Sequence, residues 1–166
     1  MATENKLKKC LLGAFRIPTW LIVILIVVLV FRIPSLFEPY SYGDEMIYLT
    51  LGQGVRQQVP LYIGLHDNKP PLLYLTAAIA GNLFWFRAIL AFWSLATIAA
   101  FWKLADRLYP KNLTLQKVAV VVFAIFTTIP LLEGNVANAE MFMLLPTTLA
   151  FYLLLSLRMP TLNLYQ

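Results

Sequence analysis

Two acidic residues, Asp44 and Glu45, stand side by side after the first long apolar stretch of the chain. A carboxylate at an exposed surface can act as a general base or as a ligand of a divalent cation. Acidic residues are also common in the first turn of a helix, where the helix dipole favours negative charge. The pair therefore has a catalytic interpretation and a purely structural one.

A second polar group consists of His66, Asp67, Asn68 and Lys69, and it directly precedes Pro70-Pro71. A lone histidine is more often an ordinary loop residue than a metal ligand. The ammonium group of Lys69 either anchors the chain at an interface or pairs with a phosphate. Beside these ordinary roles, His66 and Lys69 are candidates for binding a phosphate group.

Arg87 lies between apolar runs, and Glu133 and Glu140 flank a short polar segment later in the chain. A cation placed near a membrane span is by default a functional-site hypothesis, and its partner is an acidic side chain or a phosphate. Glu140 is either a helix N-terminal charge or a partner of Asp44 across the fold. In the second case Asp44 and Glu140, with Lys69 and Arg87 nearby, would suit a phosphate-linked substrate and a divalent metal bound by the two carboxylates.

The composition indicates which solvent surrounds the elements that carry these residues. Hydrophobic residues make up 60% of the 166 residues and charged residues only 13%. A soluble domain is about 25% charged, so a bilayer is the expected surroundings. The net charge of +5 does not indicate nucleic acid, because the thirteen Lys and Arg residues are scattered between apolar runs. The single cysteine, Cys10, has no partner for an internal disulfide.

Charge-free apolar runs divide the chain into membrane segments. The first, residues 11–31, contains one charged residue and is followed by no cleavage site, so we expect a retained anchor rather than a signal peptide. A helix needs about 20 residues to cross the hydrocarbon core. We expect further spans at residues 83–105, 117–132 and 139–157.

The apolar run that begins at Pro70 creates a conflict with the charges. If it crossed the membrane completely, the basic stretch 103–117 would lie outside, against the positive-inside rule. The conflict disappears if residues 70–82 form a half-helix on the outer face, which is tolerated where it lines a cavity or is covered by protein. The sequence therefore predicts an all-α bundle of about four spans, with residues 32–82 as an outer loop.

We expect an amphipathic helix within this outer loop, over residues 46–58. Ser41 is placed to cap its start, and Asp44 and Glu45 would occupy its first turn. Its apolar stripe recurs every four residues and consists of Ile47, Leu51 and Val55.

The ordered set of motifs resembles the GT-C glycosyltransferases, in particular the protein O-mannosyltransferase and lipid A aminoarabinose-transferase group. An acidic pair follows the first span, here Asp44-Glu45, and a Lys-Pro motif opens a membrane-dipping helix, here Lys69-Pro70-Pro71-Leu72. An arginine then starts the next span, here Arg87, and a second acidic position follows, here Glu140. The resemblance covers residues 11–157 and implies a GT-C-like transmembrane bundle.

The resemblance implies transfer of a sugar from a polyprenyl-phosphate donor to a hydroxyl of a glycan, lipid or protein acceptor on the outer face. By this analogy Asp44 activates the acceptor, and Glu45 shares either that role or the role given below to Glu140. Lys69 and Arg87 would stabilise the departing lipid phosphate. Glu140 would support a divalent metal or the acceptor.

The resemblance also implies a multi-pass protein of a bacterial plasma membrane, and the charge distribution places its N-terminus in the cytoplasm. Related enzymes have more spans, so we expect residues 1–166 to be the N-terminal part of such an enzyme and incomplete on their own. The alternative is a non-catalytic membrane module, such as a lipid-binding or transporter subunit. A transporter would show polar or broken helices near the midplane and inverted repeats, and no repeat is visible here.

Overall fold

The structure, a computed structural model, describes residues 17–39 and 42–158. Within this part the regular structure is entirely helical, and no strand is present. The expected beginning of the first span at residue 11, the expected cap residue Ser41, and Cys10 lie outside the described residues. The helical segments in chain order are α2 (Thr19–Arg32), the 3-10 turn η1 (Pro34–Leu36), α3 (Gly43–Arg56), α4 (Pro71–Ala80), α5 (Leu83–Leu108), α6 (Leu113–Phe126), the 3-10 turn η2 (Pro130–Leu132) and α7 (Ala139–Arg158).

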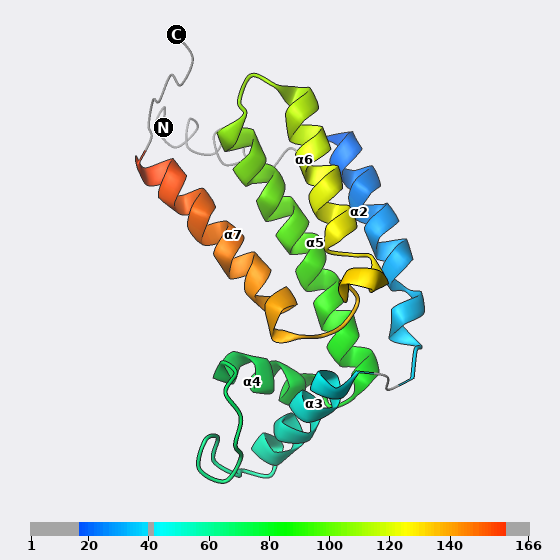
Figure 1. Ribbon diagram of the computed structural model, residues 1–166, viewed down its shortest axis with the longest axis vertical. Coiled ribbons are helices and arrows are strands. Elements are labelled where there is room, and N and C mark those ends of the chain that lie inside the picture. The colour runs from blue at the N-terminus through cyan, green and yellow to red at the C-terminus, as the bar shows by residue number, and fades with distance from the viewer. Residues whose placement is uncertain (1–16, 40–41, 159–166) are drawn as a thin grey trace, which may run out of the picture.

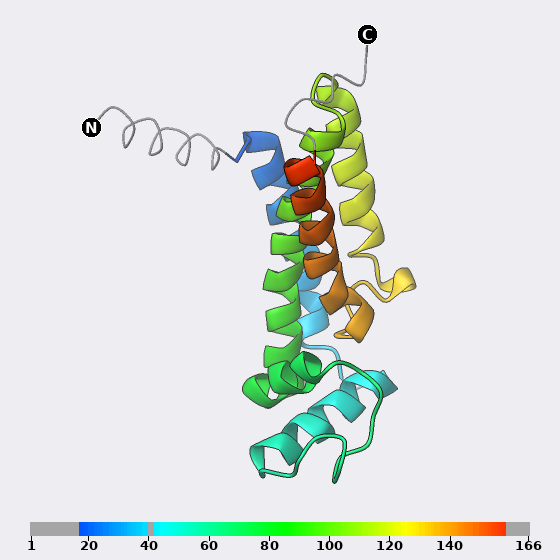
Figure 2. The same ribbon diagram turned by 90° about the vertical axis from the view of Figure 1, so that its left-hand side faces the viewer.

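Helix α5 is the longest of these helices and forms the centre of the bundle. Helices α2 and α6 pack along one side of it, and α7 packs along another (Figure 1). Helices α3 and α4 pack against each other and form a short layer across one end of the bundle, which Figure 2 shows from the side. We call this end, where α5 begins, the site end, and the opposite end, where α5 meets α6, the basic end.

The described part of the chain contains three helices that are long and apolar enough to cross a membrane. They cover Thr19–Leu36, Leu83–Leu108 and Ala139–Ser156. This finding supports a membrane protein, as the composition predicted. It agrees in position with three of the four expected spans.

Helix α6 differs from the expected span at 117–132. It begins earlier, because the Asn112 side chain accepts the backbone N–H of Leu115 at 2.9 Å and caps the helix. It ends at Phe126, and Pro130 keeps Ile129 in an extended conformation that cannot continue a helix. Its 14 residues span about 21 Å, less than the hydrocarbon core of about 30 Å.

Helix α4 has the length that the predicted half-helix requires. Its 10 residues rise about 15 Å, roughly half of the hydrocarbon core. It ends at Gly81, whose φ of 73° lies in the left-handed region that favours glycine. The chain turns there and enters α5.

Helix α3 buries part of its predicted apolar stripe and residues beside it. Leu51 and Val55 of the stripe are partly buried against the core, whereas Ile47 is 49% exposed. The most deeply buried residues of the helix are Glu45, Tyr48 and Gly52. Gly52 allows the backbones of α3 and α4 to touch. A Cβ added at Gly52 would lie 2.7 Å from the backbone nitrogen of Ala78.

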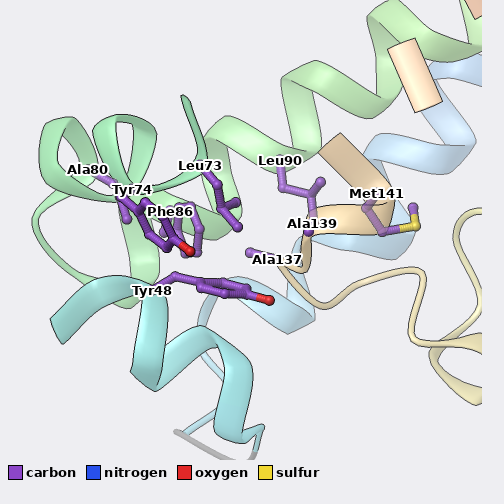
Figure 3. Close-up of a cluster of buried hydrophobic side chains, with 10 residues drawn as sticks. Tyr48, Leu73, Tyr74, Ala80, Phe86, Leu90, Ala137, Ala139 and Met141 are labelled. Carbon is purple, nitrogen blue, oxygen red and sulfur yellow. The ribbon is translucent and has the colours of Figure 1, made fainter. Parts of the chain in front are cut away.

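An apolar cluster fills the space between this layer and the bundle, as Figure 3 shows. It joins side chains from α3, α4, α5 and the start of α7, so that the short layer is packed onto the bundle. Its buried members are Tyr48, Leu73, Tyr74, Ala77, Ala80, Phe86, Leu90, Ala137, Ala139 and Met141.

Helix α7 contains a proline, Pro146, within its length. Proline has no N–H, so the carbonyl oxygen of Phe142 loses its ordinary helical partner. The indole Nε1 of Trp93 on α5 donates to this oxygen at 2.9 Å. The bond satisfies a carbonyl that could find no water inside a bilayer, and it holds α7 against α5.

The contact at Gly52 predicts a packing defect when a methyl group is added. Gly52→Ala forces α3 and α4 apart, so we expect the free energy of unfolding in detergent micelles to fall by about 1–3 kcal/mol. Gly43→Ala is the matched control, because a Cβ there meets nothing within 4 Å. Equal stability of the two variants would contradict the close packing of α3 on α4.

Candidate functional site

The site end is built around a buried ion pair between Glu45, near the start of α3, and Arg87, near the start of α5. Arg87 Nε donates to Glu45 Oε1 at 2.9 Å, and Arg87 Nη2 donates to Glu45 Oε2 at 2.6 Å. The two side chains are only 2% and 1% exposed. Because two parallel bonds fix orientation as well as distance, the pair sets the position of α3 relative to α5.

The remaining bonds of the pair reach other segments. Arg87 Nη1 donates to the carbonyl oxygens of Ser35 at 2.7 Å and Glu38 at 3.0 Å. Glu45 Oε1 accepts the backbone N–H of Ala137 at 2.8 Å. Of the two partners expected for Arg87, an acidic side chain or a phosphate, this structure contains the acidic side chain. A phosphate contact of Arg87 stays a prediction.

A second buried guanidinium, that of Arg32 at the end of α2, holds the loop between α6 and α7. Its Nη2 donates to the carbonyl oxygens of Thr127 at 2.8 Å and Gly134 at 2.7 Å. Arg32 is 1% exposed, and its Nε has no partner among the described residues. Arg32 was not among the residues that the sequence predicted to be functional. Its position directly after an apolar run was the available signal.

Asp44 and Glu45 differ in environment although they are neighbours. Successive residues of a helix point about 100° apart, so a buried Glu45 leaves Asp44 at the edge of the contact. Asp44 is partly exposed, and its Oδ2 accepts the Tyr48 hydroxyl at 3.2 Å. Burial, followed by the charge of Asp44, raises the pKa of Tyr48, which therefore remains a donor. Asp44 is the member of the pair that solvent or substrate can reach.

Lys69 and Glu140 form an exposed ion pair at 3.2 Å, with side chains 32% and 66% exposed. Two tyrosines hold the Lys69 backbone: the Tyr74 hydroxyl accepts its N–H at 3.0 Å, and the Tyr62 hydroxyl donates to its carbonyl at 2.7 Å. An exposed pair contributes little to stability and exchanges partners easily. The ammonium is therefore positioned by its backbone and available to another anion.

Tyrosine rings connect Asp44 to Lys69. The rings of Tyr48 and Tyr74 lie 6.2 Å apart, and their hydroxyls bond to Asp44 and to the backbone of Lys69. Lys69 in turn pairs with Glu140 at 3.2 Å, so a chain of contacts links the three charged residues. The structure thus brings Asp44, Lys69 and Glu140 together at the site end.

An apolar groove of about 380 Å³ lies between α4, α5 and α7. Pro70 and Ala139 belong to its walls, and they directly follow Lys69 and directly precede Glu140 in the chain. The exposed ion pair therefore stands at one end of the groove. The walls also include Leu72, Trp93, Phe142, Met143, Pro146 and Leu149.

The remaining predicted site features are not brought into this group. His66 is exposed in the loop between α3 and α4, without a hydrogen bond or ion pair to the described residues. Within the described ranges, no three His, Cys, Asp or Glu side chains are grouped to hold a metal ion. Glu140 is paired with Lys69 instead. Metal binding by Asp44 and Glu140 stays a prediction.

Tyr42 and Glu133 form a contact that the sequence did not indicate. The Tyr42 hydroxyl donates to Glu133 Oε2 at 2.8 Å. This bond, then burial, and then the charges of Glu133, Asp44 and Glu140 raise the pKa of Tyr42 from 10.0 to about 12. The phenol therefore stays protonated and tethers the loop between α6 and α7 to the start of α3.

Comparison with protein-family models, with curated proteins and with solved structures finds no match for this chain.

The buried pair predicts a large cost for removing its negative charge. Glu45→Gln keeps the shape of the side chain but leaves the Arg87 guanidinium buried without a counter-ion. We expect the free energy of unfolding to fall by about 3–5 kcal/mol in a denaturant titration in micelles. Glu38→Gln, at an exposed glutamate, is the control and should cost less than about 1 kcal/mol. A small loss for Glu45→Gln would show that the pair is not buried in solution.

The Tyr42 bond predicts a titration that depends on Glu133. The ultraviolet absorbance of tyrosinate, taken as the difference between the parent protein and Tyr42→Phe, should titrate near pH 12. Glu133→Gln removes the acceptor charge, so this titration should move down toward pH 10.0, the ordinary value. An unchanged titration in Glu133→Gln would refute the contact.

Proposed function

We propose that this chain is the part of a membrane glycosyltransferase that binds the lipid-linked sugar donor. The enzyme would move a sugar from a polyprenyl phosphate to an acceptor hydroxyl. The observation that carries the proposal is the exposed Lys69–Glu140 pair at the end of an apolar groove, with Asp44 linked to Lys69 through Tyr48 and Tyr74. The ion pair at one end of the apolar groove matches a substrate that has a phosphate group and a long hydrocarbon tail.

Lys69 is the cation assigned to the phosphate. Its side chain is 32% exposed, and its present partner Glu140 is more exposed still, so a phosphate can replace that carboxylate. The hydrocarbon tail would lie along the groove, against Leu72 and Phe142. The tail is in equally apolar surroundings elsewhere in the bilayer, so this contact orients the donor and contributes through close packing rather than through the hydrophobic effect.

Asp44 is the base assigned to the acceptor. As the acceptor oxygen bonds to the anomeric carbon, the bond from that carbon to the phosphate oxygen breaks. Asp44 takes the proton of the hydroxyl, and the electron pair of the broken bond goes to the lipid phosphate. Lys69 stabilises the negative charge that develops there. The Tyr48 hydroxyl orients the Asp44 carboxylate through the bond of 3.2 Å.

Glu45 and Arg87 act in this proposal as positioning residues. Both are buried, and their mutual bonds leave Glu45 no access to a substrate. Of the two adjacent acidic residues, Asp44 therefore takes part in the chemistry and Glu45 holds the structure. Arg87 supports the site by fixing the start of α3, which carries Asp44.

The proposed orientation places the site end outside and the basic end in the cytoplasm of a bacterial cell. It rests on the basic residues of stretch 103–117, which the positive-inside rule assigns to the cytoplasmic side. With the site end outward, the acceptor would be a glycan, lipid or protein of the cell envelope.

Asp44→Asn tests the proposed chemistry. In the protein expressed from its complete gene and reconstituted in vesicles, transfer from a polyprenyl-phosphate sugar should fall by about 10²–10⁴-fold, the usual contribution of a general base. Binding of the lipid donor should remain, because Lys69 and the groove are unchanged. Asp106→Asn, at the basic end, is the matched control and should transfer normally.

Undiminished transfer by Asp44→Asn would remove the proposed base. Retained binding of a polyprenyl phosphate, with no transfer by the parent protein for any donor and acceptor tried, would favour the alternative of a lipid-binding module. The groove and Lys69 support that alternative equally. Only the requirement for Asp44 distinguishes the two.

A further inference from the structure

The loop between α3 and α4, residues 57–70, places a tyrosine in a backbone conformation that bulky side chains rarely adopt. Tyr62 has a φ of 64°, in the left-handed region. This conformation costs free energy in a residue with a Cβ, and it persists only where the surroundings determine it. Strained residues of this kind cluster at active sites and ligand clamps, so the contacts of Tyr62 indicate what its conformation serves.

Helix ends account for the other positive φ angles of non-glycine residues in the part of the chain that the structure describes. Gln58, with a φ of 63°, follows the last turn of α3, where the N–H of Val59 donates to the carbonyl oxygen of Gly54 at 3.1 Å. A left-handed residue is usual at such a helix end. Glu133, with a φ of 56°, is the C-cap of η2. Tyr62 lies at no helix end, so its conformation has a different cause.

The turn around Tyr62 is anchored on both sides. Leu61 and Leu65 form a β-bridge, and the N–H of Tyr62 donates to the carbonyl oxygen of Leu65 at 2.7 Å. The Leu61 side chain packs against the apolar cluster of the site end. The Leu65 side chain lies on α3, where a Cβ added at Gly54 would be 2.8 Å from Leu65 Cδ1. These anchors hold the turn in its strained conformation.

The strained conformation brings the Tyr62 side chain to Lys69. Its hydroxyl donates to the Lys69 carbonyl oxygen at 2.7 Å. Its ring lies edge-on to the ring of Tyr74, with centroids 6.3 Å apart and an angle of 69° between the planes. The Tyr74 hydroxyl in turn accepts the N–H of Lys69 at 3.0 Å. One buried tyrosine and one exposed tyrosine therefore hold the same peptide segment from both sides.

This arrangement orders the backbone of Lys69 before any ligand binds. Only the side chain of Lys69 remains to be ordered when its ammonium takes up an anion, and ordering a side chain costs less than ordering a loop as well. The neighbouring residues His66 and Asn68 are exposed. Without the Tyr62 bond, the described contacts hold the Lys69 backbone from its N–H side alone.

We propose that Tyr62 is a positioning residue that holds Lys69 for binding of the lipid phosphate. Its left-handed backbone directs the phenol to the Lys69 carbonyl oxygen, and the anchored turn keeps it there. The ammonium exchanges Glu140 for the phosphate by rotation of its side chain, while the backbone stays in place. This inference rests on the proposed function, because Tyr62 acts only through Lys69 and the donor that Lys69 binds.

The dissociation constant of undecaprenyl phosphate tests this role in the protein expressed from its complete gene and purified in micelles. Tyr62→Phe keeps the ring and removes the hydroxyl, so the constant should rise about two- to tenfold, the contribution of an ordinary hydrogen bond. Lys69→Gln should raise it further, because it removes a charge-assisted bond to the phosphate. In the Lys69→Gln background, adding Tyr62→Phe should change the constant by less than about 1.5-fold, since Tyr62 acts through the ammonium.

Tyr109→Phe, which removes a phenol hydroxyl at the basic end, is the matched control and should bind like the parent protein. If Tyr62→Phe binds normally while Lys69→Gln binds weakly, the positioning role is overturned and the donor assignment stands. An equal loss from Tyr62→Phe in both backgrounds also overturns that role, because Tyr62 would then act on the fold or touch the lipid itself. Normal binding by Lys69→Gln would remove the phosphate contact of the proposed function, and the role of Tyr62 with it.

Discussion

The interior of this bundle holds a carboxylate and a guanidinium that cannot be separated. An unpaired buried charge costs several kcal/mol, so Glu45 on α3 and Arg87 on α5 can be buried only in contact with each other. Once they meet, the start of α3 is fixed against the start of α5. The bonds from Glu45 to Ala137, and from Arg87 to the turn after α2, extend that constraint to α7 and α2. The helices that assemble the site end are thereby oriented by one ion pair.

This constraint explains why two adjacent acidic residues have different environments. The helix that buries Glu45 turns Asp44 toward the edge of the layer, where it is partly exposed and bonded to Tyr48. Buried side chains are suited to positioning, and exposed ones to contact with a substrate. The same contrast separates Arg87, whose donors are used inside the protein, from Lys69, whose ammonium is exposed. The proposed function depends on the more exposed acid, Asp44, and on the more exposed cation, Lys69.

Much of the architecture could be predicted from the sequence because it depends on local length and charge. Apolar runs long enough for a bilayer predict α2, α5 and α7. The distribution of basic residues predicts that residues 70–82 do not cross the membrane completely, and the 10 residues of α4 agree with this. The gathering of Asp44, Lys69 and Glu140 at the end opposite stretch 103–117 agrees with that charge argument.

Features that depend on contacts between distant residues could not be predicted in the same way. The bonds of Glu45 to Arg87 and of Arg32 to Thr127 and Gly134 join residues 42, 95 and 102 positions apart, and no local pattern encodes them. The apolar stripe of α3 predicted only part of its buried face, because Leu51 and Val55 pack against the core but Ile47 does not. Gly52 and Glu45 face inward, since close backbone contact and ion pairing outweigh the hydrophobicity of Ile47.

The central claim is that Glu45 and Arg87 act as one unit, and a double-mutant cycle measures this most directly. The free energy of unfolding in micelles would be compared for the parent protein, Glu45→Gln, Arg87→Gln and the double variant. If each residue is buried by virtue of the other, the second substitution costs far less than the first, and a coupling energy of about 2–3 kcal/mol results. Additive losses within about 0.5 kcal/mol would contradict the claim, because they would mean that the two charges do not meet.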